Sequence, residues 1–255
     1  ANKSGIEIAM DFALQCSPDH PWAKDHRDWF TIRSDGSIAY AENPPKKYQD
    51  IFPINFDKDY EGILNESIRI LTLWISQGVK IFRVDNPHTK PVQFWQDLIK
   101  RISNMHHDVV FLAEAFTRPA IMGALGKAGF QQSYTYFTWR TTKDEIVNYG
   151  SEVAHETSAF FRPNFWVNTP DILPFHLQSG DPLVFASRAL LASTLAPSWG
   201  MYAGFELFEA ARLKEGGEEY LDSEKYEIKI RDWKSAGESD KNLMGFVGQL
   251  NSIRR

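Results

Sequence analysis

Apolar residues occur along the chain in two patterns, short runs and longer stretches with helical spacing. Each short run is bounded by polar or turn-forming residues and therefore predicts a strand. The predicted strands cover residues 6–14, 79–85, 108–116, 133–139, 165–168 and 198–205. The longer stretches predict helices, because their apolar residues share one face at helical spacing. The predicted helices cover residues 62–77, 91–102, 119–127, 143–155, 183–195 and 243–253.

Three of the predicted strands end at or just before an acidic residue. Asp85 ends one strand, Glu114 ends the next, and Asp171 follows the strand at residues 165–168. Strand, helix and strand in succession form a βαβ unit, which places both strand ends on the same edge of a parallel sheet. We therefore expect Asp85 and Glu114 to face each other. Arg83 shares a strand face with Asp85, and this pair taken alone is equally compatible with a structural ion pair.

The alternation of strands and helices, with carboxylates at strand ends, predicts a partial (β/α)8 TIM barrel. It would run from the third strand to the eighth helix, with the first two βα units absent from this chain. Residues 1–255 would form one catalytic barrel fragment, with 16–60 as a long substrate-binding loop and 206–242 as an inserted βα loop. An open doubly wound sheet is the alternative, but no glycine-rich phosphate turn follows the first strand.

The composition limits the classes of binding partner and indicates the cellular compartment. The net charge of −5 argues against a nucleic acid or an anionic membrane surface as a partner. No apolar run approaches the length of about 20 residues that a membrane span needs, and no signal peptide begins the chain. The single cysteine, Cys16, is expected to be buried and inert rather than a nucleophile. These features predict a cytoplasmic protein.

The acidic strand ends resemble the motifs of the α-amylase superfamily of retaining glycosidases and transglycosylases. The resemblance covers nearly the whole chain and rests on Asp11, on Phe82-Arg83-Val84-Asp85, on Glu114 and on Asp171. Two stretches are more specific, namely residues 83–91 (RVDNPHTKP) and 113–119 (AEAFTRP). They resemble the bacterial maltose-1-phosphate maltosyltransferases, which extend α-1,4-glucans from α-maltose 1-phosphate.

Two departures from ordinary amylases favour this narrower resemblance. Amylases usually have Asn-His after the first of these strands, where this chain has Gln15-Cys16. They usually have His before the last catalytic aspartate, where this chain has Thr169-Pro170. Both positions help to hold sugar and metal in amylases. Their loss argues against simple starch hydrolysis and against bound calcium, and neither a metal nor a cofactor is expected.

The resemblance implies that Asp85 is the nucleophile, Glu114 the general acid/base and Asp171 the transition-state stabiliser. These roles agree with the residues themselves. A retaining mechanism needs one ionised carboxylate, which Arg83 favours at Asp85. It also needs a second carboxyl with a raised pKa, which the apolar residues around Glu114 favour.

The resemblance also implies a set of substrate-binding residues. Asn43, Lys46 and Tyr48 present an amide, a cation and a phenol that suit one phosphate, although a solvated loop lysine is the alternative for Lys46. The full set consists of Gln15, Asn43, Lys46, Tyr48, Asp50, Arg83, Asn86, Lys225 and Tyr226.

These features together predict a glycosyltransferase that acts by retaining double displacement. It would transfer maltosyl units from α-maltose 1-phosphate to the non-reducing end of α-1,4-glucans such as glycogen, and the full-length protein would be a homodimer. One alternative is an α-glucan hydrolase or a branching-type transglycosylase with a neutral donor. Another is an inactive carbohydrate-binding barrel, which the three retained carboxylates disfavour.

Overall fold

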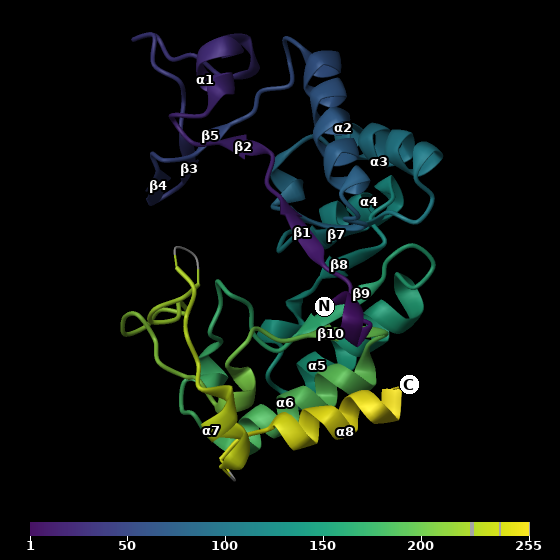
Figure 1. The fold of residues 1–255 in the computed structure, drawn as a ribbon, viewed down its shortest axis with the longest axis vertical. Coiled ribbons are helices and arrows are strands. Elements are labelled where there is room, and N and C mark those ends of the chain that lie inside the picture. Colours follow the sequence, from purple (N-terminus) through teal and green to yellow (C-terminus); the bar gives the residue numbers. More distant parts are fainter. Residues whose placement is uncertain (225–226, 240, 255) are drawn as a thin grey trace. The chain divides into compact units, whose positions relative to one another are not determined.

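The computed structural model describes residues 1–224, 227–239 and 241–254. The chain divides into two compact units, residues 1–131 and 132–255, whose elements are drawn in Figure 1. Within each unit, parallel strands alternate along the sequence with helices. None of the helices in the described part of the chain combines the length and apolarity that crossing a membrane requires.

The first unit has a parallel sheet in the order β1-β6-β7. Its strands are β1 (Ala9–Phe12), β6 (Ile81–Asp85) and β7 (Val110–Glu114), and its longer helices are α2 (Tyr60–Ser76), α3 (Val92–Met105) and α4 (Pro119–Ala128). These elements confirm the predicted βαβ arrangement. Strand β1 is shorter than the predicted strand at residues 6–14.

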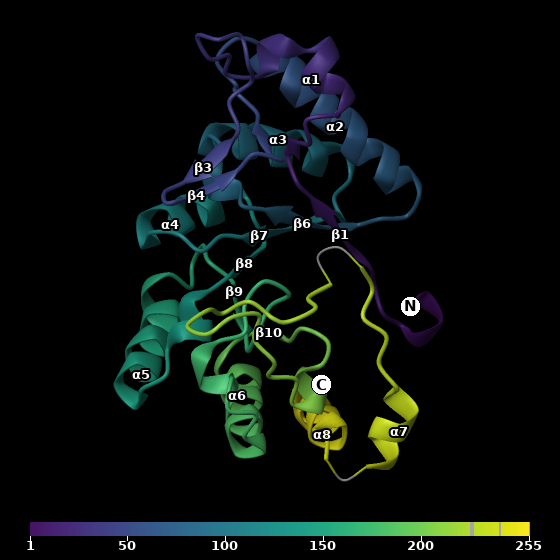
Figure 2. The same cartoon turned by 90° about the vertical axis from the view of Figure 1, so that its left-hand side faces the viewer.

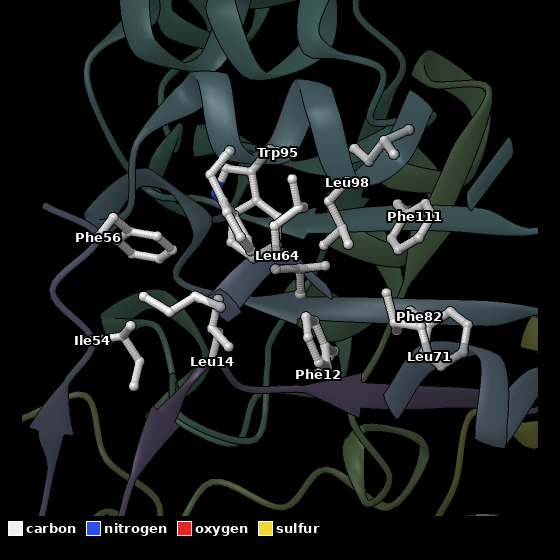
Figure 3. Packing of buried hydrophobic residues seen from close by; sticks show 14 of the residues in the cluster. Phe12, Leu14, Ile54, Phe56, Leu64, Leu71, Phe82, Trp95, Leu98 and Phe111 are labelled. Carbon is white, nitrogen blue, oxygen red and sulfur yellow. The ribbon is translucent and has the colours of Figure 1, made fainter. Parts of the chain in front are cut away.

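The side chains of β6 explain why this strand forms and how it is oriented. Phe82 and Val84 are fully buried, whereas Arg83 and Asp85 lie on the opposite face and are partly exposed. Phe82 packs in a cluster that helices α2 and α3 also supply, shown in Figure 3. Trp95 of α3 is fully buried there, and its indole N–H donates to the carbonyl oxygen of Pro87 at 2.8 Å. The core therefore fixes both β6 and the turn that follows it.

The segment between β1 and α2, expected to be a long irregular loop, contains short regular elements. They are β2 (Gln15–Cys16), α1 (Pro21–Asp25), a 3₁₀ turn (Arg27–Trp29), β3 (Ala41–Asn43), β4 (Lys46–Tyr48) and β5 (Phe52–Pro53). Strand β2 pairs with β5, and β3 pairs with β4 in a hairpin visible in Figure 2. Trp29 and Phe30 of this segment are buried. Buried aromatic side chains therefore hold the segment in a defined conformation.

The second unit has parallel strands in the order β8-β9-β10. They are β8 (Gln132–Tyr134), β9 (Pro163–Trp166) and β10 (Ser198–Gly200), and the helices are α5 (Lys143–Ser151), α6 (Pro182–Leu195), α7 (Trp233–Glu238) and α8 (Met244–Arg254). A π-helical turn, Glu152–Glu156, extends α5, and 3₁₀ turns cover Tyr136–Trp139, Phe175–Leu177 and Phe205–Leu207. Helices α6 and α8 pack against each other.

Two strands predicted in this unit are too long. The strand expected at residues 133–139 ends at Tyr134. Beyond it, side-chain hydrogen bonds take the place of backbone pairing with β9. The hydroxyls of Thr135 and Thr138 donate to the carbonyl oxygens of Asn164 and Trp166. The strand expected at 198–205 ends at Gly200. Beyond it, the backbone N–H of Tyr202 donates to a side-chain amide rather than to a neighbouring strand.

Candidate active site

Asp85 and Glu114 end two adjacent strands of the first unit. They are direct register partners, Asp85 on β6 and Glu114 on β7, as the sequence predicted. The guanidinium of Arg83 lies 3.2 Å from the Asp85 carboxylate and 3.8 Å from that of Glu114. It also lies 3.2 Å from the carboxylate of Asp11, its own register partner on β1. The structure thus gathers three carboxylates around one arginine, and we call these four residues the Arg83 cluster.

The carboxylates of this cluster differ in their exposure to solvent. The side chain of Glu114 is 10% exposed and that of Asp85 is 19% exposed, whereas that of Asp11 is 68% exposed. Buried Ala113 and Ala115 flank Glu114 on its strand. Burial of this kind disfavours a charged carboxylate, while Arg83 favours it, so the two influences on Glu114 oppose each other.

Besides Arg83, two of the predicted substrate-binding residues contact these carboxylates directly. The amide of Gln15, on β2, donates to Asp85 Oδ2 at 3.3 Å. The side-chain amide of Asn86 donates to Asp85 Oδ1 at 3.4 Å, and the backbone N–H of Asn86 donates to Glu114 Oε2 at 3.1 Å. Gln15 and Asn86 therefore fix the orientation of the two carboxylates, in addition to any contact with a substrate.

The residues predicted to bind phosphate lie on the β3–β4 hairpin. Asn43 and Lys46 occupy paired positions on either side of its Pro44-Pro45 turn, and Tyr48 pairs with Ala41. Lys46 is exposed, and so is Asp50, which follows the hairpin. The hairpin thus brings Asn43 and Lys46 together, while their contact with a phosphate remains a prediction.

Asp171 lies in the second unit, on a tight turn after β9. Its backbone N–H donates to the Thr169 hydroxyl at 3.2 Å, and Thr169 pairs with Ile172 across the turn. The Asp171 side chain is exposed, at the carboxyl end of β9 as predicted. Beneath the turn, fully buried Asn168 donates to the hydroxyl of Tyr220 at 2.6 Å. The approach of Asp171 to Asp85 and Glu114 remains a prediction.

Lys225 and Tyr226 lie outside the described residues, but ion pairs surround the flanking chain. Glu224 accepts hydrogen bonds from the Tyr202 hydroxyl at 2.7 Å, from the Arg231 guanidinium at 3.1 Å and from the backbone N–H of Lys229 at 3.2 Å. Arg231 also contacts Glu209 at 2.8 and 3.1 Å, and its side chain is only 5% exposed. We call Tyr202, Glu209, Glu224, Lys229 and Arg231 the Arg231 network. It gives defined structure to part of the predicted 206–242 insertion.

Hydrogen bonds shift the pKa values of the carboxyl groups in this network. Hydrogen bonds from Tyr202 and Arg231 hold the pKa of Glu224 below its ordinary value, although burial opposes them. Burial opposes ionisation of Glu209 too, but hydrogen bonds from Arg231 and Lys229 prevail and lower its pKa. Both carboxylates are therefore held in the charged form.

The sequence assigns no role to three residues, of which one belongs to the Arg83 cluster and two lie in the turn beside it. Asp11 was noted only as a motif residue, and its contact with Arg83 follows from the register of β1 against β6. His88 and Lys90 lie in the turn after Asp85, where a 3₁₀ conformation gives no periodic signal. Burial lowers the pKa of both, and His88 Nδ1 has no hydrogen-bond partner among the described residues.

Cys16 behaves as predicted. It is 3% exposed, and burial raises the pKa of its thiol to about 12. A thiol in that state is a poor nucleophile. Among residues 1–224, 227–239 and 241–254, no group of three or more His, Cys, Asp or Glu side chains is arranged to hold a metal ion.

Comparison with known sequences yields relatives along the whole chain, although no family model matches it. It is 58% identical over 255 residues to alpha-1,4-glucan:maltose-1-phosphate maltosyltransferase 1 of Streptomyces coelicolor, covering 100% of this chain and 38% of that protein. It is also 58% identical to the alpha-1,4-glucan:maltose-1-phosphate maltosyltransferase of Mycolicibacterium smegmatis and 57% identical to that of Mycobacterium tuberculosis, covering 36% of each. The chain thus spans a little over one third of the length of these curated relatives.

Solved structures with a similar fold are enzymes of the α-amylase family. An α-amylase from Geobacillus thermoleovorans superposes with a TM-score of 0.73 at 14% identity, covering 99% of this chain and 58% of that one. A cyclomaltodextrinase superposes with a TM-score of 0.72 at 16% identity, covering 99% of this chain and 46% of that one. These matches confirm the predicted α-amylase-type (β/α) barrel, of which the chain holds a part. The sequence matches confirm the resemblance to the maltosyltransferases.

Proposed function

Because the chain matches maltosyltransferases over its whole length, we propose that the full-length protein transfers maltosyl units from α-maltose 1-phosphate to the non-reducing end of α-1,4-glucans. The observation that carries the proposal is the register of Asp85 with Glu114, with Arg83 between them. Of the residues predicted to act in catalysis, these two are placed against each other by one continuous backbone ladder.

The neighbouring strands suit a retaining mechanism. Retaining glycosidases place their two carboxyl groups about 5–5.5 Å apart, whereas inverting enzymes leave about 6.5–9.5 Å for a water molecule. Adjacent strands lie about 4.8 Å apart, so side chains at paired positions start from nearly the retaining separation. This spacing is compatible with double displacement, in which Asp85 rather than the acceptor first attacks the anomeric carbon.

In the first step, an Asp85 oxygen forms a bond to the anomeric carbon while the bond from that carbon to the phosphate oxygen breaks. Phosphate leaves with the electron pair of that bond and takes a proton from Glu114, which is thereby ionised for the second step. In the second step, Glu114 takes the proton of an acceptor hydroxyl, whose oxygen attacks the anomeric carbon and displaces Asp85. Asp171 binds sugar hydroxyls and favours the flattened ring of the transition state. Each step restores the charge that the other consumes.

In this proposal, the predicted substrate-binding residues hold the donor. Gln15, Arg83 and Asn86 lie at the carboxylates and bind the reacting sugar. Asn43, Lys46 and Tyr48 on the hairpin bind the phosphate, with Asp50 beside them, while Lys225 and Tyr226 bind the distal glucose. The homodimer and the cytoplasmic location remain part of this proposal, and the single buried thiol supports the latter.

The sharpest test replaces Lys46 by Ala in the full-length protein. Loss of a charge-assisted contact with phosphate costs about 1.5–3 kcal/mol, or roughly 10- to 150-fold in donor affinity. We expect kcat/KM to fall by that factor for α-maltose 1-phosphate, measured as phosphate release with glycogen. The value for maltosyl fluoride should stay nearly unchanged, because fluoride makes no such ion pair.

Lys47→Ala is the matched control. Lys47 precedes Tyr48 on the same strand, and its side chain points to the opposite face from that of Lys46. It should affect neither donor. Equal losses on both donors for Lys46→Ala would make Lys46 structural, and absence of phosphate release by the wild-type protein would favour a neutral donor.

A further inference from the structure

The turn after β6 contains a lysine, Lys90, to which neither the resemblance nor the chemistry above assigns a role. The ammonium of Lys90 is half-buried and donates to the carbonyl oxygens of Asp85 and Asn86, at 3.4 and 3.3 Å. A lysine usually keeps its charge in water, because burial of an ammonium is costly unless polar partners replace the solvent. Here two consecutive backbone carbonyls supply that replacement.

One of these carbonyls belongs to the peptide group that contacts Glu114. The carbonyl oxygen of Asp85 and the N–H of Asn86 are the two ends of a single peptide unit. Lys90 donates to the oxygen end, and the N–H end donates to Glu114 Oε2 at 3.1 Å. A cation on a carbonyl oxygen polarises the peptide and strengthens the bond that its N–H makes. Lys90 therefore acts on Glu114 through one rigid planar group.

The backbone of this turn has a conformation that needs support. Asn86 has φ 43° and ψ 52°, in the left-handed region that few residues other than glycine adopt. Thr89 fixes the far side of the turn, with its hydroxyl donating to the carbonyl oxygen of Asn86 at 2.8 Å. The backbone N–H of Thr89 donates to the same oxygen at 3.1 Å, and Lys90 adds a third donor. Together they hold the peptide planes on both sides of Asn86.

The geometry points to Lys90 as a positioning residue, which orients the Asp85–Asn86 peptide so that its N–H holds Glu114 in place for the second displacement. The inference rests on the proposed retaining mechanism but not on the identity of the leaving group. The charged and titratable groups around this turn are His88 within it, Arg83 and Asp85 from β6 and Glu114 from β7.

The test replaces Lys90 by Met in the full-length protein, which keeps the length of the side chain and removes its charge and donors. Maltosyl fluoride serves as the donor, because its turnover needs Asp85 and Glu114 but no phosphate site. We expect kcat to fall on the order of 10- to 100-fold, as misplacement of a catalytic group does. KM should not rise, and a maltosyl adduct on Asp85 should accumulate in intact mass spectra, because removal of the adduct needs Glu114.

Two further measurements separate positioning from folding. The acidic limb of the pH profile of kcat should move to higher pH in Lys90→Met, because an ionised Glu114 loses a hydrogen bond and a nearby cation. Lys90→Arg, which keeps charge and donors, should recover most of kcat. If Lys90→Met does not fold, Lys90→Gln takes its place with the same expected directions.

Lys80→Met is the matched control. Lys80 lies just before the opposite end of the same strand and forms an ion pair with Asp108 at the surface. It should change neither kcat nor the pH profile. A Lys90→Met protein with wild-type kcat, or with a lowered kcat but no adduct and an unmoved pH limb, would overturn the inference. Failure of phosphate release alone would instead count against the proposed donor.

Discussion

The Arg83 cluster and the Arg231 network, both centred on an arginine, are built differently. In the Arg83 cluster, the guanidinium lies 3.2 Å from Asp11 and Asp85 and 3.8 Å from Glu114, so one cation meets three carboxylates. In the Arg231 network, the contacts with Glu209 and Glu224 are 2.8 to 3.1 Å, and Lys229 adds a second cation. The Arg231 side chain is 5% exposed, against 19% for Arg83.

This difference indicates what each cluster does. Short, paired contacts between equal numbers of cations and carboxylates hold a polypeptide segment in place. An excess of carboxylates around one arginine leaves negative charge that a substrate or a developing oxocarbenium ion can meet. We therefore expect changes in the Arg83 cluster to cost activity and changes in the Arg231 network to cost local stability.

Asp85→Ala has the largest expected effect and tests most directly whether the Arg83 cluster serves activity rather than stability. Removal of the nucleophile should lower kcat by about 10⁴-fold or more, as loss of a nucleophile does in other covalent mechanisms. Donor binding should persist, because Gln15 and Asn86 remain, and calorimetric titration with α-maltose 1-phosphate measures it. Thermal stability should change little, because the substitution relieves repulsion among neighbouring carboxylates. A variant that loses stability but retains activity would identify the Arg83 cluster as structural.

Glu114→Ala should have a smaller and more selective effect. Phosphate and fluoride leave without much help from an acid, so the first displacement should continue. The second displacement needs a base, and its loss should slow turnover by about 10²- to 10⁴-fold. A covalent maltosyl group should then accumulate on Asp85, located by peptide mass spectrometry. An adduct on Asp171 would reverse the roles assigned to these aspartates.

The sequence predicts the Arg83 cluster better than the surrounding turns. The run of apolar residues before Asp85 and the similar run before Glu114 indicated two parallel strands, and their register places the carboxylates side by side. The contact between Asp11 and Arg83 was not predicted, because register between strands separated by about 70 residues leaves no local pattern. The same holds for the Arg231 network, whose partners come from an apparently bland charged segment.

The turns were predicted least well, because their conformation depends on single hydrogen bonds. The left-handed Asn86 and the donation of Lys90 to its carbonyl oxygen have no signature in hydrophobic periodicity. The early end of β8 likewise depends on hydroxyl groups of Thr135 and Thr138 that bond to β9. Strands with one buried face are specified by many residues together, whereas each of these turns depends on a few.

Arg231→Met tests the other half of the comparison. Loss of one member of a buried ion pair typically destabilises the folded state by about 3–5 kcal/mol. We expect a cost of about 3 kcal/mol for Arg231→Met, because the side chains of Glu209 and Glu224 are partly exposed. Hydrogen exchange in residues 202–224 should speed up accordingly, while kcat on maltosyl fluoride falls less than in Asp85→Ala. The control is Arg212→Met, which removes from the same segment an exposed guanidinium that donates a hydrogen bond to Gln178. It should change the free energy of local opening, measured by hydrogen exchange, by less than about 0.5 kcal/mol.

The smallest expected effect is on the pH dependence of hydrogen exchange in residues 202–224. It tests whether the ion pairs of Arg231 stabilise this segment. The folded-state pKa values of Glu209 and Glu224 lie below their ordinary value of 4.5, so their contribution to stability is complete above that pH. It is lost as the pH falls through the folded-state values. The difference between wild type and Arg231→Met should therefore be constant from pH 7 to about 5 and shrink as the pH falls below the ordinary glutamate value. A difference that persists unchanged in acid would mean that Arg231 stabilises the segment by packing rather than by its ion pairs.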